Sequence, residues 1–177
     1  MTYRPASTDA VARMSQQWRQ VLPGLDTQPL LVLGRLQRVV ARTDPLLRLK
    51  FAAAGLGPGE FDVLAALRRE DPAGPVPAGE LAETMLVTAG AATKRADRLI
   101  AAGLVTRERS GTDGRGRYLA LTGRGRELTD RLMTAHMDTE ASILSGLGQS
   151  EQDQLAHLLS RLLNHLEEPS DHETTGD

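Results

Sequence analysis

Cationic side chains in two short runs are the residues of this sequence best suited to chemistry with a partner molecule. The first run places a hydroxyl and three cations close together, and its members are Thr93, Lys94, Arg95 and Arg98. The second run, Arg115 and Arg117, stands among glycines. Lysine and arginine bind phosphate oxygens, and arginine also enters the narrow minor groove of DNA. The two runs therefore indicate contact with nucleic acid, provided that the fold brings them to one surface.

A pair of short helices is predicted to position the first run. The sequence predicts a helix over 77–85, a turn at 86–87 and a second helix over 88–102. Thr88 suits the N-cap because its hydroxyl can accept from an amide of the first turn, and Gly103 suits the position after the C-cap. Apolar residues recur at helical spacing and give the second helix one buried face, made of Ala89, Ala92, Ala96, Leu99 and Ile100. The cations fall largely on its other side.

A β-hairpin is predicted to follow, with arms over 104–109 and 115–121 and a glycine-rich loop between them. Helix, turn, helix and hairpin in this order make a winged helix–turn–helix, whose second helix enters the DNA major groove. That helix begins with small residues, which allow its N-terminal amides to approach phosphates and base edges. The predicted DNA contacts are Thr88, Ala89, Gly90, Thr93, Lys94, Arg95, Arg98, Arg115 and Arg117.

The net charge of −2 hides an uneven distribution along the chain. Residues 85–126 hold nine Lys or Arg against three Asp or Glu, whereas residues 127–177 hold two against eleven. Basic charge is thus concentrated on the segment that is predicted to read DNA, which is the electrostatic pattern expected of a nucleic-acid-binding surface. This distribution favours double-stranded DNA as the partner.

Enzyme chemistry finds no support in the sequence. The chain has no cysteine, which excludes disulfides, thiolate zinc sites and cysteine nucleophiles. It has no phosphate-binding glycine loop, no nucleophile elbow and no metalloprotease motif. The histidines lie in the C-terminal third without metal-ligand spacing, at His136, His157, His165 and His172. We therefore expect no enzyme, no cofactor and no metal site.

The hydropathy pattern favours a cytoplasmic protein. No uninterrupted apolar run reaches the roughly 18 residues that a membrane-spanning helix needs. No apolar run of the signal-peptide kind follows the first residues. We expect no membrane association.

Helices are predicted to flank the winged helix–turn–helix, so the expected fold class is mainly α with a small β-wing. The predicted organisation is a disordered N-terminus over 1–8, N-terminal helices for dimerisation and a pocket wall over 9–54, the winged helix–turn–helix over 55–122, C-terminal dimerisation helices over 123–167 and a disordered tail over 168–177. Pro45 is expected to kink or restart the long N-terminal helix. Ser150 is expected to cap the last helix.

The flanking helices carry more apolar surface than so small a central module could cover. The last helix alone has a wide leucine stripe, formed by Leu155, Leu158, Leu159, Leu162, Leu163 and Leu166. The simplest burial is against a second copy in a two-fold dimer. Such a dimer would place its two second helices about 34 Å apart on a pseudo-palindromic site. The alternative is that all helices pack together within a monomer.

Three separated segments resemble the MarR family of bacterial transcriptional regulators, namely 59–67, 89–105 and 118–125. The segments occur in the family's order, and the similarity extends over about residues 28–167. The resemblance implies a homodimeric winged helix–turn–helix, usually a repressor, that a small phenolic or acidic molecule releases from DNA. The family's wing usually carries an Asp-Arg-Arg run. Here Asp113 and Arg115 match it, but Gly114 replaces the first arginine.

A narrower set of residues looks like the urate-responsive branch of that family. Trp18 falls in an extra N-terminal helix, and Asp62, Arg95 and Arg107 match further positions. By this resemblance Trp18, Asp62 and Arg107 would line a ligand pocket, and Arg95 would connect that pocket to DNA. The chemistry agrees, because an aromatic ring can stack on a purine and an arginine can hold an anion with two donors. Urate or another small acid is therefore the expected effector.

Two alternatives stay open. Trp18 could be a packing anchor, with Asp62 and Arg107 forming a structural ion pair. The winged helix could also serve protein–protein contact without specific DNA binding. The basic segment and the small residues that begin the second helix argue against that second alternative.

Overall fold

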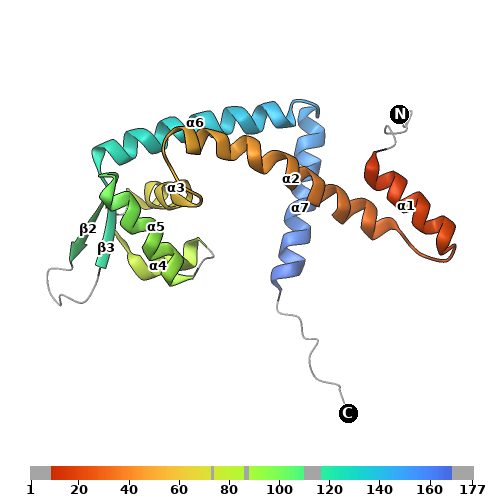
Figure 1. The fold of residues 1–177 in the computed structure, drawn as a ribbon, viewed down its shortest axis with the longest axis horizontal. Coiled ribbons are helices and arrows are strands. Elements are labelled where there is room, and N and C mark those ends of the chain that lie inside the picture. The colour runs from red at the N-terminus through yellow and green to blue at the C-terminus, as the bar shows by residue number, and fades with distance from the viewer. Residues whose placement is uncertain (1–8, 73, 86–87, 110–116, 169–177) are drawn as a thin grey trace, which may run out of the picture. The chain divides into compact units, whose positions relative to one another are not determined.

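A computed structural model describes residues 9–72, 74–85, 88–109 and 117–168 (Figure 1). Its elements are α1 (Ala10–Val21), α2 (Gln28–Ala53), α3 (Glu60–Glu70), β1 (Val76–Pro77), α4 (Ala78–Thr84), α5 (Ala89–Ala101), β2 (Val105–Arg109), β3 (Arg117–Leu121), α6 (Gly123–Leu144) and α7 (Gln149–Glu167). The predicted fold class, mainly α with a small β-wing, is confirmed. The termini predicted to be disordered, the turn at 86–87 and the tip of the hairpin lie outside the described residues.

Two units make up the chain, one over residues 1–136 and the other over residues 137–177. In the first unit, α1 packs on α2 through a buried hydrogen bond between the hydroxyls of Ser15 and Thr27, 2.8 Å apart. Arg35 of α2 reaches back to Asp9, the N-cap of α1, at 2.9 Å. These contacts hold the N-terminal helix against the first part of α2.

The predicted restart of the helix at Pro45 is wrong, because α2 continues through it as one helix of 26 residues. Proline removes one backbone donor, which leaves the carbonyl of Ala41 without its helical partner. Pro45 and Ala41 are both exposed, so water can satisfy that carbonyl. Asp44 does not cap a new helix but accepts from Arg48, one turn later, at 2.7 Å.

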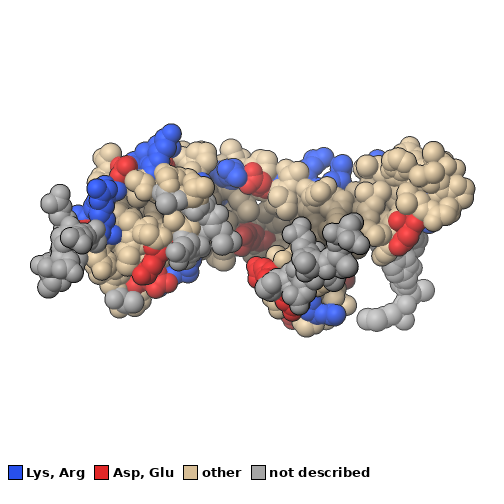
Figure 2. Space-filling view, turned by 90° about the horizontal axis from the view of Figure 1, so that it is seen from below, with Lys and Arg blue, Asp and Glu red and all other residues tan. Residues whose placement is uncertain are grey.

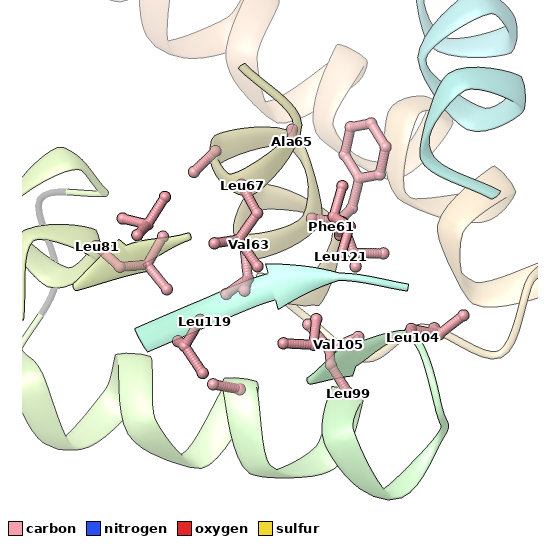
Figure 3. Close-up of a cluster of buried hydrophobic side chains, with 14 of the residues drawn as sticks. Phe61, Val63, Ala65, Leu67, Leu81, Leu99, Leu104, Val105, Leu119 and Leu121 are labelled. Atoms are coloured by element: carbon pink, nitrogen blue, oxygen red, sulfur yellow. The ribbon is translucent and has the colours of Figure 1, made fainter. Parts of the chain in front are cut away.

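A three-stranded antiparallel sheet with the order β1–β3–β2 forms one wall of the winged helix–turn–helix. Val76 pairs with Leu119, and Val105 pairs with Leu121, so the central strand β3 is hydrogen-bonded on both edges. Side chains of α3, α5 and the strands converge on β3 (Figure 3). The largest fully buried side chains of this core are those of Val63, Leu64, Leu67, Leu81, Leu99, Val105 and Leu119.

Local signals set the limits of α5 as predicted. The Thr88 hydroxyl accepts from the amide of Ala91 at 3.3 Å and caps the helix. Gly103 follows the helix with a φ of +69°, a left-handed conformation that favours glycine. The predicted apolar face is confirmed at its centre, where Ala92, Ala96 and Leu99 are buried.

Hydrogen bonds and close packing hold the start of α6 against the residues that precede β2. Thr122 caps α6 by accepting from the amide of Gly125 at 2.9 Å, and its hydroxyl donates to the carbonyl of Gly103. Gly125 lies so close to Leu104 that a β-carbon would overlap the Leu104 carbonyl oxygen. The absence of a side chain at this position therefore lets α6 begin in contact with the wing.

A chain of ion pairs connects α3 to α6. Arg126 donates two hydrogen bonds to Asp71, at 2.7 and 2.8 Å, and Arg68 donates two to Asp130, at 2.8 and 3.1 Å. The Arg126 hydrogen bonds lower the pKa of the Asp71 carboxyl, and those from Arg68 lower the pKa of Asp130.

These two carboxyl groups should make the fold sensitive to acid. A carboxyl whose pKa is lowered by folding stabilises the folded state above its ordinary value of 3.8, and protonation at lower pH removes that contribution. We expect the urea midpoint of the wild type to fall more steeply between about pH 4 and 2 than that of Asp71→Asn/Asp130→Asn. Parallel pH profiles for the two proteins would contradict this expectation.

The second unit holds the end of α6 and the long helix α7. The predicted cap at Ser150 is wrong by two residues, since α7 begins at Gln149 with Gly148 as its N-cap. The carboxylate of Glu151 accepts from the Gly148 amide at 2.8 Å, so a longer side chain from inside the first turn does the capping. α7 has no buried residue, although leucine is its commonest residue. No helix in the described part of the chain is long and apolar enough to span a bilayer.

Candidate nucleic-acid interface and ligand pocket

The N-terminal half of α5 presents small and polar residues to solvent. Thr88, Gly90, Thr93 and Lys94 are exposed, and all four were predicted to contact DNA. The free amides at the N-terminus of a helix attract anions, and the small residues leave them accessible. The side chain of Ala89 and the whole of Arg115, also predicted contacts, lie outside the described residues.

The two strands of the wing lie beside this helix. Arg117, at the start of β3, is exposed, as predicted for a DNA contact. The face shown in Figure 2 carries basic and acidic side chains close to one another and no continuous basic surface. Ion pairs partly offset the excess of positive charge in this segment, since Arg98, Arg107 and Arg126 each pair with a carboxylate.

Arg95 and Arg98, the remaining predicted DNA contacts, lie against the first turn of α3. Arg98 reaches the carboxylate of Glu60 at 3.4 Å. The guanidinium of Arg95 lies over the backbone of Gly59, where a β-carbon would overlap its central carbon. Gly59 has a φ of +74°, a left-handed conformation that favours glycine, and a side chain at this position would also displace the Arg95 guanidinium.

Glu60 organises the turn on which these arginines rest. Its side chain is buried, and one carboxylate oxygen accepts from the backbone amide of Gly57 at 2.7 Å. The other oxygen faces Arg98. A buried carboxylate is stable only when it is hydrogen-bonded, and here both oxygens have a partner. Glu60 therefore joins the turn at 57–59 to the second half of α5.

A pocket of about 410 Å³ opens on the other side of the same turn. Its apolar wall contains Phe51 and Phe61, stacked with centroids 4.1 Å apart, and His136 lies 5.4 Å from the Phe51 ring. Charged side chains line the rest, and these are Asp44, Arg48, Asp62 and Arg95. Small-molecule sites in proteins have similar volumes and a similar combination of an apolar surface with a few polar groups.

The cations of the pocket differ in their pairing. Arg48 donates to Asp44, and that hydrogen bond raises the pKa of the Arg48 guanidinium. Arg95 forms no ion pair with any residue that the structure describes. Arg95 is therefore the cation most ready to receive an anion.

The structure separates the four residues that were predicted to bind a ligand. Asp62 and Arg95 line the pocket together. Trp18, on α1, is half-exposed and is not among the lining residues. Arg107, on β2, pairs with Asp97 of α5 at 2.6 Å and lies outside the pocket.

Comparisons with known proteins agree with this arrangement. A model of the MarR family matches residues 54–116. The chain is 35% identical to the HTH-type transcriptional regulator PecS of Dickeya dadantii over 156 residues, which are 88% of this chain and 94% of that protein. The chain belongs to the MarR family.

Two further relatives support membership of the MarR family. The chain is 30% identical to the HTH-type transcriptional repressor MdtR of Bacillus subtilis over 127 residues, which are 72% of this chain and 80% of that protein. The fold also matches a crystal structure of a mutant MarR from E. coli in complex with operator DNA, with a TM-score of 0.64 and 26% sequence identity. The match covers 82% of this chain and 97% of the MarR chain. This MarR-family protein is accordingly a transcriptional regulator and not an enzyme.

Sequence reasoning missed several residues at these sites. The pocket includes Arg48, Phe51, Phe61 and His136, and Glu60 supports the turn beside it. One signal was available, because Phe51 and Phe61 are the only two phenylalanines of the chain. Their contact depends on how α2 and α3 pack, which periodicity within either helix does not reveal.

Proposed function

We propose that this MarR-family regulator binds a pseudo-palindromic DNA site as a homodimer, represses transcription there, and is released by a small planar acid. The observation that carries the proposal is the exposed N-terminal half of α5, with small residues at its start and the wing beside it. A helix of this kind enters the major groove in winged helix–turn–helix proteins. The operator complex of E. coli MarR supports the same mode for the present chain.

The proposal of a dimer rests on the long helices. Neither α2, with 26 residues, nor α7, with 19, has a buried residue within the single chain. Exposed large apolar side chains follow both helices, among them Leu33, Val39, Val40, Leu158, Leu163 and Leu166. Exposed apolar side chains in such number along a helix usually mark an interface. A second copy would cover it and place two α5 helices one DNA turn apart, at about 34 Å.

The proposal of a planar acidic effector rests on the pocket. The stacked Phe51 and Phe61 offer an apolar surface to an aromatic ring, and Arg95 offers two donors to an anion. Asp62 can accept from ring N–H groups, which makes urate a suitable member of this class. Arg95 belongs to α5, so an anion that attracts its guanidinium away from Gly59 would favour another position of the helix. The effector would then act through its different affinities for the two positions.

DNA binding should be tested with the purified protein, the DNA upstream of its own gene and a scrambled duplex of equal length, at physiological salt. Non-specific binding is expected only at about 10⁻⁴–10⁻⁶ M. We expect saturation at nanomolar protein on the upstream DNA alone. Equal and weak binding to both duplexes would instead favour a winged helix used for protein contact.

Urate and other aromatic acids should then be titrated into the complex. We expect release of the DNA from the wild type, and a loss of the response by at least about tenfold in Asp62→Asn and Arg95→Gln, because a charge-assisted hydrogen bond contributes about 1.5–3 kcal/mol. Asp153→Asn removes the same charge from the exposed surface of α7 and should respond normally. A full response by both pocket variants would refute the pocket assignment.

A further inference from the structure

Arg107 makes the ion pair that connects the wing to the recognition helix α5. We propose that Asp97 and Arg107 are a positioning pair, which fixes β2 against α5, and that Arg107 serves DNA binding through Asp97 and does not hold the effector. The inference rests on the proposed DNA-binding function and assigns a role within it.

The register of the hairpin places Arg107 on the side of the wing that faces α5. Arg107 lies opposite Leu119 across the ladder, and Val105, two residues earlier, lies opposite Leu121. Side chains two apart on a strand share a face, and directly paired residues do so as well. Because Val105, Leu119 and Leu121 are all buried in the core, Arg107 stands on the core side of the sheet, one step nearer the tip of the wing.

The partner of Arg107 is Asp97, which lies on α5. Its carboxylate accepts from Arg107 Nη2 at 2.6 Å, a short distance that is typical of a charge-assisted hydrogen bond. Towards the base of the wing, apolar residues such as Leu99 and Val105 hold α5 to β2. The pair continues this contact beyond the apolar core, and within the described residues no other ion pair connects α5 to a strand.

The space around Arg107 excludes an effector of the proposed kind. Its pocket has a volume of about 30 Å³, against about 410 Å³ for the pocket that holds Asp62. A pocket of this volume has room for only a few water molecules, since one water needs at least about 10–15 Å³ of such space. Half of the residues that line the small pocket are buried core residues, namely Leu81, Ala92, Ala96 and Leu119. An acid at this place would have to displace both Asp97 and part of the core.

The sign of the effect separates positioning from simple electrostatics. Removing a negative charge near DNA should strengthen binding if only the net charge matters, because phosphates repel carboxylates. A positioning role predicts the opposite for Asp97→Asn. Glu108→Gln is the matched control, since Glu108 is the next residue of β2, is exposed and points to the other side of the sheet.

The test compares Asp97→Asn, Arg107→Gln, the charge swap Asp97→Arg/Arg107→Asp, Glu108→Gln and the wild type. We expect each single variant of the pair to bind the upstream DNA about two- to fivefold more weakly, which corresponds to about 0.4–1 kcal/mol at 1.4 kcal/mol per tenfold. The swap should recover to within about twofold of the wild type. Glu108→Gln should bind as well as the wild type or more tightly, and every variant should retain its response to urate.

Amide hydrogen exchange in the free protein gives a second measurement that needs no DNA. Losing either partner should accelerate exchange in 105–109 and 117–121 to the same degree, and the swap should restore protection. If the wild type does not bind its upstream DNA specifically, the proposed function fails, while exchange still shows whether the pair restrains the wing.

Three results would overturn the inference. The first is tighter DNA binding by Asp97→Asn. The second is a loss of the urate response in Arg107→Gln alone, which would make Arg107 an effector residue. The third is a lower salt dependence of DNA binding in Arg107→Gln alone, because this would show direct contact with a phosphate.

Discussion

Replacing Gly125 by alanine should destabilise the winged-helix unit by about 3 kcal/mol, the upper end of the range for overpacking a core. The added β-carbon would overlap the carbonyl oxygen of Leu104, which is backbone and cannot move aside as a side chain can. Gly125 is also held on both sides, since its amide donates to Thr122 and its carbonyl accepts from the buried hydroxyl of Thr129 at 2.7 Å. Relief of the overlap must therefore separate α6 from β2.

The measurement is thermal unfolding at one fixed protein concentration, because the stability of a dimer depends on concentration. A loss of this size should lower Tm by about 6–12 °C in a chain of this length. Gly123→Ala is the matched control. It is the same substitution two residues earlier in α6, where an added β-carbon would have no neighbouring atom within 4 Å. It should leave Tm unchanged or raise it, since alanine has the higher helix propensity. Equal effects of the two substitutions would contradict the argument from close contact.

Features that depend on a few neighbouring residues could be predicted from the sequence. Thr88 and Thr122 cap their helices through amides three residues away, and Gly103 ends α5 through its own backbone conformation. The apolar face of α5 follows from periodicity within one helix. These local preferences agree with the final fold, and for that reason the order of elements was predicted correctly.

Features that depend on long side chains meeting between elements could not be predicted. Helical spacing predicts Arg95 and Arg98 as DNA contacts, but it did not reveal that Arg95 lies over Gly59 or that Arg98 pairs with Glu60. An arginine has many rotamers, and its partner is decided by packing that the spacing of charges does not encode. The effect of Pro45 could not be predicted for a similar reason. The free energy that proline costs a helix depends on whether the carbonyl of Ala41, which loses its hydrogen bond, can bind water instead.

The same reasoning applies to Arg107. Its position in the sequence matches a residue that the urate-responsive resemblance places in a ligand pocket. The partner at 2.6 Å, however, is Asp97, which precedes it by ten residues and lies on another element. A motif match transfers the residue type and not its neighbours, so the role of a matched residue has to be argued again from its contacts.

Glutamate on the leucine stripe of α7 should separate the proposed dimer. Leu158 is 50% exposed and Leu163 is 56% exposed in the single chain, so Leu158→Glu/Leu163→Glu should not disturb the packing within it. In a two-fold dimer the substitutions would bury four carboxylates on an apolar interface, and unpaired buried charges are strongly unfavourable. We expect sedimentation at the mass of one 19.1 kDa chain at micromolar concentration, where the wild type should sediment at twice that mass.

Loss of the dimer should also lower the affinity for DNA. In a dimer, binding of one subunit holds the second subunit close to the second half-site, and a monomer loses this advantage. The expected loss of affinity for the upstream DNA is about 10²–10⁴-fold. Ser160→Glu adds a charge to the same helix outside the leucine stripe and should leave both mass and affinity unchanged. Leu163→Gln, a milder change, should shift dissociation to lower protein concentration without abolishing the dimer.

Hydrogen exchange of the first unit provides the remaining control. Its core, formed by residues such as Leu64 and Leu119, is complete within one chain and should keep its protection in the separated monomer. A double variant that still sediments as a dimer would show that α7 is not the interface. A wild type that sediments as a monomer would refute the dimer itself. In that case a single α5 helix would have to supply the whole of the specific affinity, and the exposed faces of α2 and α7 would need a different partner.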